Sequence, residues 1–98
     1  MTHELKCWPE YFVALRTGSK KFEVRRDDRV PRFELGDRLL MKEFDPRDSA
    51  RIVEGGVVVK KVGFFTGRDD EYVVTWVLRA PTVGFPKGWV VLQVEKVS

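Results

Sequence analysis

The spacing of apolar and polar residues along the chain changes at Gly18. Before this glycine, the apolar positions from Tyr11 to Leu15 recur at the spacing of one helical face. Pro9 suits the first turn of a helix, where a backbone N–H is not needed, and Gly18 is typical of a left-handed C-cap. The pattern therefore predicts a helix from Pro9 to Thr17.

After Gly18 the apolar positions alternate with a period of two, which indicates a strand. We expect Phe22 and Val24 to point into the core. Lys21, Glu23 and Arg25 would then form an outer face made entirely of charged side chains.

Apolar runs separated by turn residues predict the remaining strands, over residues 5–7, 38–44, 57–65, 71–78 and 89–97. Asp45-Pro46 is expected to open a polar loop that Gly55-Gly56 closes, and Gly63 marks a bulge or a close backbone approach. This predicts an α+β, mainly β fold, a small antiparallel barrel of five or six strands with one N-terminal helix. The expected core residues are Phe12, Leu15, Phe22, Val24, Leu39, Val58, Val90 and Leu92.

Composition favours one folded domain spanning residues 1–98. The chain has 98 residues, of which 43% are hydrophobic, and it shows no repeat or linker. Its one cysteine, Cys7, cannot form an intramolecular disulfide, so nothing points to an oxidising compartment. No apolar run approaches the ~20 residues of a membrane span, and the N-terminus does not resemble a signal peptide. We therefore expect a cytoplasmic protein with no membrane partner.

The net charge of +3 is concentrated in one segment. Between Arg16 and Arg32 there are seven basic and three acidic residues, and the rest of the chain is slightly acidic. A local basic surface with embedded carboxylates is typical of sites that meet phosphates or a polar ring, although a solvated face held by surface ion pairs has the same composition.

Metal and nucleophile chemistry find little support in the sequence. His3 is the only histidine and Cys7 the only cysteine. We therefore expect neither a zinc cluster nor a Cys–His dyad within one chain. Gly55-Gly56 lacks the Lys-Ser/Thr partner of a phosphate loop. Glu43, Asp45 and Asp48 could bind a divalent cation, but Asp-Pro is a common turn sequence and explains these residues without a metal. We expect no metal and no cofactor.

Several short motifs together resemble the small prokaryotic and phage members of the ASCH group, of the DUF3850 type, within the PUA-like superfamily. The resemblance covers nearly the whole chain, with gaps in the hairpin tip and in residues 66–87. It is carried by His3-Glu4-Leu5-Lys6, Trp8-Pro9-Glu10-Tyr11-Phe12, Gly18-x-Lys20-x-x-Glu23-x-Arg25, Asp28-Arg29, Phe33-x-x-Gly36-Asp37, Glu43-Phe44-Asp45 and Gly88-Trp89-Val90-Val91-Leu92.

The resemblance implies a PUA-like pseudo-barrel with a cleft beside the helix that takes RNA, a nucleotide or a modified base. Lys20, Glu23 and Arg25 match the family motif, and such a set can read a base edge and hold a phosphate. Glu23 and Arg25 can equally be a simple ion pair. The other expected binding residues lie before and after this motif: Lys6, Trp8, Tyr11, Arg26, Asp28 and Arg29.

Each flanking residue also has a plainer interpretation. Trp8 and Tyr11 could stack a base or belong to the core. Lys6 interrupts an apolar segment, and it could contact a ligand or be a lysine that snorkels to solvent. Arg26 and Arg29 are expected to contact the nucleic-acid backbone.

The predicted function is binding of RNA, single-stranded nucleic acid or a nucleotide by a monomer or weak dimer. One alternative is a protein-interaction module. Another is an amidohydrolase, because a related ASCH branch deacetylates N4-acetylcytidine with a lysine, a threonine and a glutamate. Lys20 matches that lysine, but the threonine position is Glu23 here, and a lysine beside a carboxylate tends to stay protonated. If the chain is an enzyme, Lys20 and Glu23 are the expected catalytic residues.

Overall fold

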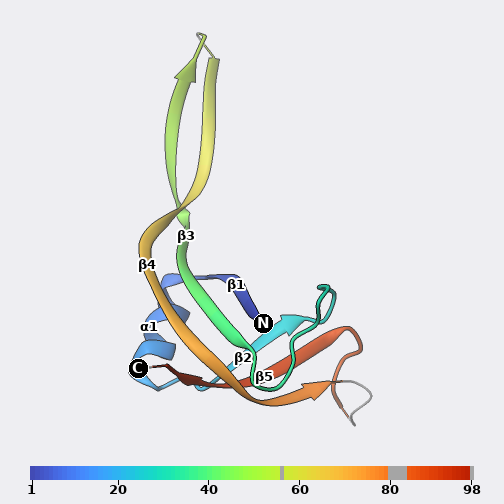
Figure 1. Ribbon diagram of the computed structural model, residues 1–98. Coiled ribbons are helices and arrows are strands. Elements are labelled where there is room, and N and C mark those ends of the chain that lie inside the picture. The colour runs from blue at the N-terminus through green and yellow to red at the C-terminus, as the bar shows by residue number, and fades with distance from the viewer. Residues whose placement is uncertain (56, 80–83, 98) are drawn as a thin grey trace.

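The computed structural model describes the backbone of residues 1–55, 57–79 and 84–97, and the side chains of these ranges except 48–54 and 57–62. One helix and five strands follow each other along the described part of the chain (Figure 1). They are β1 (Thr2–Cys7), α1 (Pro9–Thr17), β2 (Phe22–Arg26), β3 (Arg38–Glu54), β4 (Val57–Arg79) and β5 (Trp89–Lys96).

The five strands form one curled sheet in the order β1-β3-β4-β5-β2 (Figure 1). β1 pairs in parallel with β3, and the other three neighbouring pairs are antiparallel. The expectation of a small, mainly β and mostly antiparallel barrel with one N-terminal helix is therefore confirmed. Because β1 and β2 are the two edge strands, the sheet is a half-barrel with one open side.

Helix α1 has the predicted bounds because both of its ends are determined locally. The Phe12 N–H donates to the Trp8 carbonyl at 2.8 Å, and Pro9 stands in the first turn. Gly18 adopts φ 83°, where its N–H donates to the Leu15 carbonyl at 3.2 Å. Within the described part of the chain, no helix combines the length and apolar character that crossing a membrane needs.

Strands β3 and β4 are much longer than the sequence predicts. The expected loop that begins at Asp45-Pro46 is strand, and the two strands expected over 57–65 and 71–78 are one continuous strand, β4. Pairing continues because two register shifts, at Lys42/Phe44 and at Asp45/Ser49, absorb extra residues without ending the ladder. The far ends of β3 and β4 form a ribbon that projects from the half-barrel (Figure 1).

Gly63 confirms the predicted close backbone approach. It adopts φ 83° and is buried beside the Phe44 ring. A Cβ atom at this position would lie 2.8 Å from Cε1 of Phe44 and 3.1 Å from the Asp45 carbonyl oxygen. Only glycine therefore fits the register shift at the foot of the ribbon.

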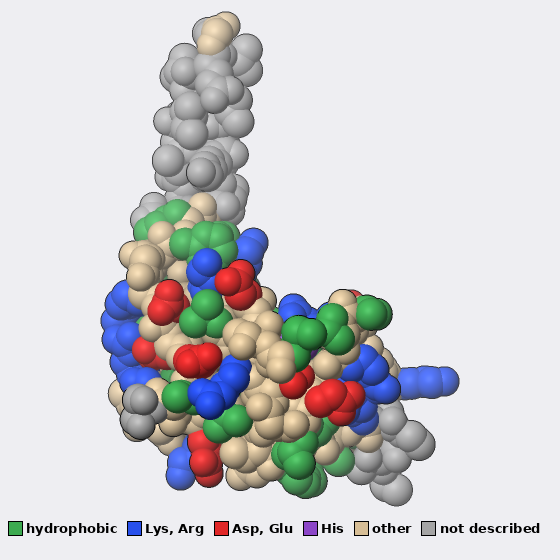
Figure 2. Space-filling view, in the orientation of Figure 1, with side chains coloured by type: hydrophobic (Ala, Val, Ile, Leu, Met, Phe, Trp, Pro, Cys, Tyr) green, Lys and Arg blue, Asp and Glu red, His purple; other side chains and the backbone are tan. Residues whose placement is uncertain are grey.

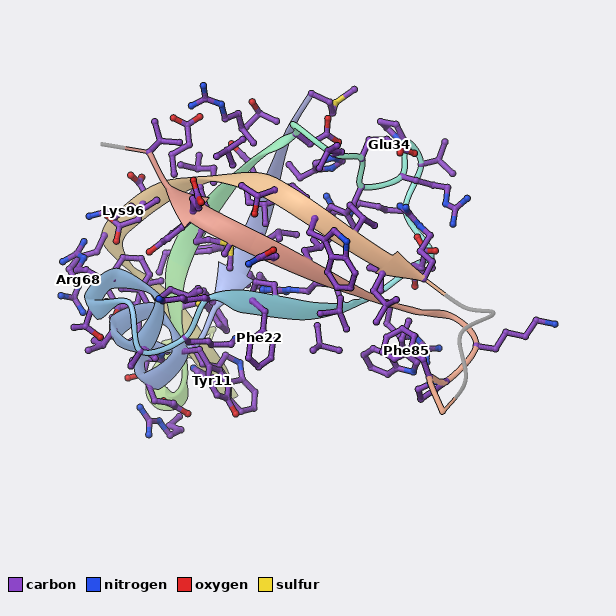
Figure 3. The ribbon with its side chains drawn as sticks, turned by 90° about the horizontal axis from the view of Figure 1, so that it is seen from below. Tyr11, Phe22, Glu34, Arg68, Phe85 and Lys96 are labelled. Carbon is purple, nitrogen blue, oxygen red and sulfur yellow. The ribbon has the colours of Figure 1, made fainter. Side chains whose placement is uncertain are left out.

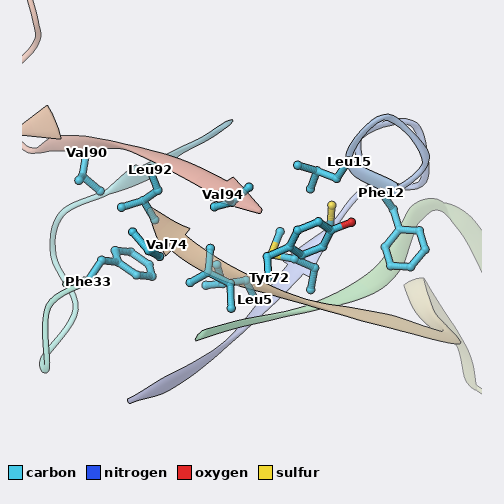
Figure 4. Close-up of a cluster of buried hydrophobic side chains, with 12 residues drawn as sticks. Leu5, Phe12, Leu15, Phe33, Tyr72, Val74, Val90, Leu92 and Val94 are labelled. Carbon is cyan, nitrogen blue, oxygen red and sulfur yellow. The ribbon is translucent and has the colours of Figure 1, made fainter. Parts of the chain in front are cut away.

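The core lies between the concave face of the sheet and α1 (Figure 4). Five of the expected core residues are buried there: Phe12, Leu15, Leu39, Val90 and Leu92. Figure 4 shows Leu15 and Phe12 descending from the helix around Tyr72, with Leu5 on the other side of the ring. The side chain of Val58, also expected in the core, lies outside the described residues.

The expected orientation of β2 is wrong. Phe22 and Val24 are 50% and 45% exposed, whereas Glu23 is only 3% exposed and faces the concave side. A period of two identifies two faces of a strand but does not say which face points inward. Here the charged face points inward, because Glu23 finds two cationic partners at the open side of the half-barrel.

Candidate nucleic-acid interface at the open side of the half-barrel

Two arginines bridge the open side between the edge strands. Arg25 on β2 donates from Nη2 to the Lys6 carbonyl on β1 at 2.9 Å. Arg29, in the loop after β2, contacts Nδ1 of His3 on β1 at 3.2 Å. Because a guanidinium can only donate, Nδ1 accepts and Nε2 carries the proton that it donates to Asp37 at 2.8 Å. Side chains thus hold together two edges that share no strand pairing.

A cleft of about 630 Å³ opens beside α1, and we call it the helix cleft. Its walls come from the end of β1, the first turn of α1, strand β2 and the start of β5. The lining residues are Lys6, Cys7, Trp8, Tyr11, Lys20, Glu23, Val24, Arg25 and Trp89.

Glu23 organises the charges of the helix cleft. Lys20 Nζ donates to one carboxylate oxygen at 2.7 Å, and Arg25 Nε donates to the other at 3.0 Å. The Glu23 side chain is 4% exposed, whereas both cations reach solvent. A buried carboxylate is stable only when it is paired and hydrogen-bonded, so Glu23 depends on both cations.

Aromatic rings flank these charges. Trp8 and Tyr11 are both about half exposed, and their rings stack with centroids 6.2 Å apart and an angle of 20° between their planes. The Lys20 ammonium lies 4.8 Å from the Tyr11 centroid and 6.0 Å from that of Phe22. Figure 3 shows Tyr11 and Phe22 side by side at the foot of α1. Trp8 and Tyr11 are therefore surface residues, and their core interpretation is wrong.

A second hollow of about 400 Å³, which we call the seam pocket, adjoins the helix cleft and shares Val24, Arg25 and Trp89 with it. The Arg26 guanidinium lies 5.0 Å from the Trp89 ring, and that of Arg29 lies 4.8 Å from the Phe33 ring. The lining residues are Leu5, Val24, Arg25, Arg26, Asp28, Arg29, Phe33 and Trp89.

The structure divides the expected site residues between these two hollows. Lys6, Lys20, Glu23 and Arg25 all line the helix cleft, so their predicted convergence is confirmed. Trp8 and Tyr11 join them there, and Arg26, Asp28 and Arg29 line the seam pocket.

Lys6 connects the helix cleft to a group of phenylalanines at the foot of the ribbon. Its ammonium lies 4.6 Å from the Phe44 ring and 5.8 Å from the Phe65 ring. Phe64 and Phe65 are nearly half exposed, and Lys42 lies 5.4 Å from Phe65. Figure 2 shows hydrophobic side chains and Lys or Arg side chains together just below the ribbon.

Sequence reasoning does not single out Trp89 as a site residue, although it lines both hollows. Its place follows from the pairing of β5 with β2, which sets Trp89 opposite Arg26. The signal in the sequence is the motif Gly88-Trp89, but the register of two strands distant in the chain cannot be deduced from it.

Cys7 also lines the helix cleft, as a protonated thiol. Burial, followed by the nearby negative charge of Glu23, raises the pKa of Cys7 from 9.0 to about 11. The neutral thiol can act there as a weak hydrogen-bond donor. Among the residues whose side chains are described, no group of three or more His, Cys, Asp or Glu is arranged to hold a metal ion.

Asp27 anchors the loop that carries Asp28 and Arg29. Its carboxylate accepts from Arg32 at 2.7 Å and from Arg79 on β4 at 3.0 Å. The hydrogen bond from Arg32 holds the pKa of Asp27 below its usual value of 3.8, against the opposing effect of burial. These bonds fix one wall of the seam pocket to the sheet.

The fold and its two hollows define a class of protein: a small, mainly β half-barrel with a basic, aromatic-lined groove along its open side. The chain matches the family model described as Domain of unknown function (DUF3850) over residues 2–94, and it therefore belongs to the DUF3850 family. A search of curated proteins found no match.

Proposed function

We propose that this protein binds RNA or another single-stranded nucleic acid, with one nucleotide seated in the helix cleft. The observation that carries the proposal is the meeting of Lys20, Glu23 and Arg25 with the exposed, stacked pair Trp8 and Tyr11. Exposed aromatic rings stack bases, and cations beside them neutralise phosphates. A nucleotide needs both kinds of contact within a few ångströms.

The two hollows suit successive parts of one strand. The helix cleft, at about 630 Å³, has the size of an ordinary small-molecule site. The seam pocket shares Arg25 and Trp89 with it and presents Arg26 and Arg29 to a neighbouring phosphate. A chain of nucleotides is therefore a better match than a single free nucleotide, which would leave the seam pocket empty.

The resemblance to ASCH and PUA-like domains supports the same proposal, because it leads one to expect RNA or a modified base in a cleft beside the helix. The amidohydrolase alternative is less well supported. A lysine base must give up a proton, and the Lys20 ammonium here donates to Glu23 at 2.7 Å. Glu23 also occupies the position of the threonine in that motif.

Fluorescence anisotropy with a labelled single-stranded RNA across a salt series tests the proposal. We expect wild type to bind at low salt and to weaken as salt rises, because phosphate contacts release counterions. Arg26→Ala should weaken every sequence similarly and flatten the salt slope by about one unit.

Lys87→Ala is the matched control, since it removes one positive charge from a residue that lines neither hollow. It should bind like wild type. Absence of binding at low salt would refute the proposal, and so would equal losses in the Arg26 and Lys87 variants.

A further inference from the structure

We infer that the helix cleft selects a base edge that carries only hydrogen-bond acceptors, of which the O6/N7 edge of guanine is the best match. This inference rests on the proposed function and specifies the base that the cleft prefers. It follows from the donors and acceptors that the lining side chains leave available.

Most polar side chains of the helix cleft can only donate hydrogen bonds. Lysine, arginine and tryptophan have no acceptor atom, and the protonated thiol of Cys7 is a weak donor. The hydroxyl of Tyr11 can also accept, and the sulfur of Cys7 can accept weakly, so these two are the exceptions among the neutral polar side chains that line the cleft. The donor-only lining residues are Lys6, Trp8, Lys20, Arg25 and Trp89.

Glu23 offers a ligand little acceptor capacity, because its remaining lone pairs belong to a side chain that hardly reaches solvent. Each of its oxygens accepts a hydrogen bond from a cation, one from Lys20 and one from Arg25, and the side chain is 4% exposed. In this geometry Glu23 is therefore a poor acceptor for the exocyclic amine of a base. Glu23 is instead a positioning residue that holds two donors beside each other.

The two cations keep unused donors. Lys20 donates one ammonium proton to Glu23. Arg25 donates from Nε to Glu23 and from Nη2 to the Lys6 carbonyl. Among the described residues, their remaining protons have no hydrogen-bond partner, although the Lys20 ammonium also lies against the Tyr11 ring. Because one carboxylate holds both groups, these donors lie close enough to meet two neighbouring acceptors of one base.

The bases differ in what they offer to such a pair of donors. Guanine presents O6 and N7 side by side with no donor between them. Adenine and cytosine each place an exocyclic amine on the corresponding edge, which would set donor against donor. The helix cleft should therefore favour guanine strongly over adenine and cytosine.

The test uses labelled RNA heptamers AAAXAAA in which X is guanosine, inosine, 7-deazaguanosine or adenosine. Inosine keeps O6 and N7, and 7-deazaguanosine lacks N7. We expect the guanosine and inosine heptamers to bind about tenfold more tightly than the adenosine heptamer. The affinity of the 7-deazaguanosine heptamer should lie between those of the guanosine and adenosine heptamers. Equal affinity of the guanosine and adenosine heptamers, or tighter binding of adenosine, would overturn the inference while leaving the proposed function intact.

Variants of the cleft distinguish the positioning of the two cations by Glu23 from the general attraction between basic residues and phosphates. Glu23→Gln should reduce the guanosine-to-adenosine ratio toward one while the salt slope stays unchanged, because Arg26 and Arg29 remain in place. Lys20→Met should reduce the ratio as well, and Lys20→Arg should retain it, so a poorly folded Glu23 variant does not remove the test. An unchanged ratio in Lys20→Met would contradict the inference, and failure of all four heptamers to bind at low salt would overturn it together with the proposed function.

Discussion

Glu23 connects the stability of the fold with the proposed recognition of a base. Its carboxylate is buried, but Lys20 and Arg25 reach solvent, so the three members of the cluster depend on each other unequally. Without Glu23, each cation can turn to water. Without the cations, the Glu23 carboxylate would be left unpaired in a site that water hardly reaches.

This asymmetry predicts the order of two stability losses. The double variant Lys20→Met/Arg25→Met leaves an unpaired buried carboxylate and should lose about 3 kcal/mol of unfolding free energy. Glu23→Gln leaves two cations that water can solvate and should lose about 1 kcal/mol. Urea unfolding at neutral pH measures both, and the reverse order would show that the Glu23 carboxylate is hydrated in the folded protein.

At the scale of elements, the register shifts of β3 and β4 determine where the half-barrel ends and the ribbon begins. Glu43 on β3 accepts hydrogen bonds from Arg68 at 2.9 and 2.6 Å and from the Thr66 hydroxyl at 2.6 Å. Thr66 and Arg68 lie in the part of β4 that the first shift leaves unpaired. Three charge-assisted bonds thus tie the irregular part of β4 to Glu43, the β3 residue at the same register shift.

The Glu43 cluster predicts a loss of stability in acid. The hydrogen bonds from Arg68, assisted by Thr66, hold the pKa of Glu43 below its usual value of 4.5 in the folded state. The unfolded chain therefore binds this proton more readily, and the stability present above pH 4.5 should fall as pH drops through the lower folded pKa.

Urea midpoints between pH 7 and pH 3 measure this loss. Arg68→Met should be less stable than wild type at pH 7 and should lose less on acidification, because its Glu43 lacks the main cause of the lowered pKa. The control is Arg47→Met, which removes an exposed arginine whose ion pairs span 3.5 Å. An acid profile of Arg68→Met parallel to that of wild type would contradict this account of the cluster.

Gly63 lies at the second register shift, and Gly67 is a matched control for the effect of adding a side chain there. Both have positive φ, 83° and 93°, but only Gly63 has a ring where a Cβ would lie. Gly67→Ala should cost about 1 kcal/mol for the backbone alone. Gly63→Ala should cost about 2 kcal/mol more, because Phe44 must move. Thermal or urea unfolding of both variants tests this, and equal losses would show that the Phe44 ring moves freely.

The elements differ in how far the sequence predicts them. Helix α1 was predictable to the residue because Pro9 and Gly18 act within one turn of its ends. The inward face of β2 was not, because the burial of Glu23 depends on Lys20 and Arg25 and on the distant edge strand β1. The ribbon was missed because Asp45-Pro46 is typical of turns, whereas here a register shift accommodates it.

At the scale of the whole molecule, the local basic charge is more balanced than the sequence suggests. Arg16 pairs with Asp70, Arg32 with Asp27, and Lys20 and Arg25 with Glu23. The convergence of the motif residues was predictable from the resemblance, but the neighbouring seam pocket depends on the β2–β5 pairing that places Trp89. The groove exists because the sheet stays open between its two edge strands.

An NMR titration of the ¹⁵N-labelled protein with the heptamer AAAGAAA tests the central claim, that this open side is the binding surface, most directly. We predict that amide shifts gather on the end of β1, the first turn of α1, β2 and the loop through Arg29, and that the indole signals of Trp8 and Trp89 move with them. The Trp76 indole, half exposed and outside both hollows, should not move. Shifts centred on Trp76, or no shifts at saturating heptamer, would contradict the account.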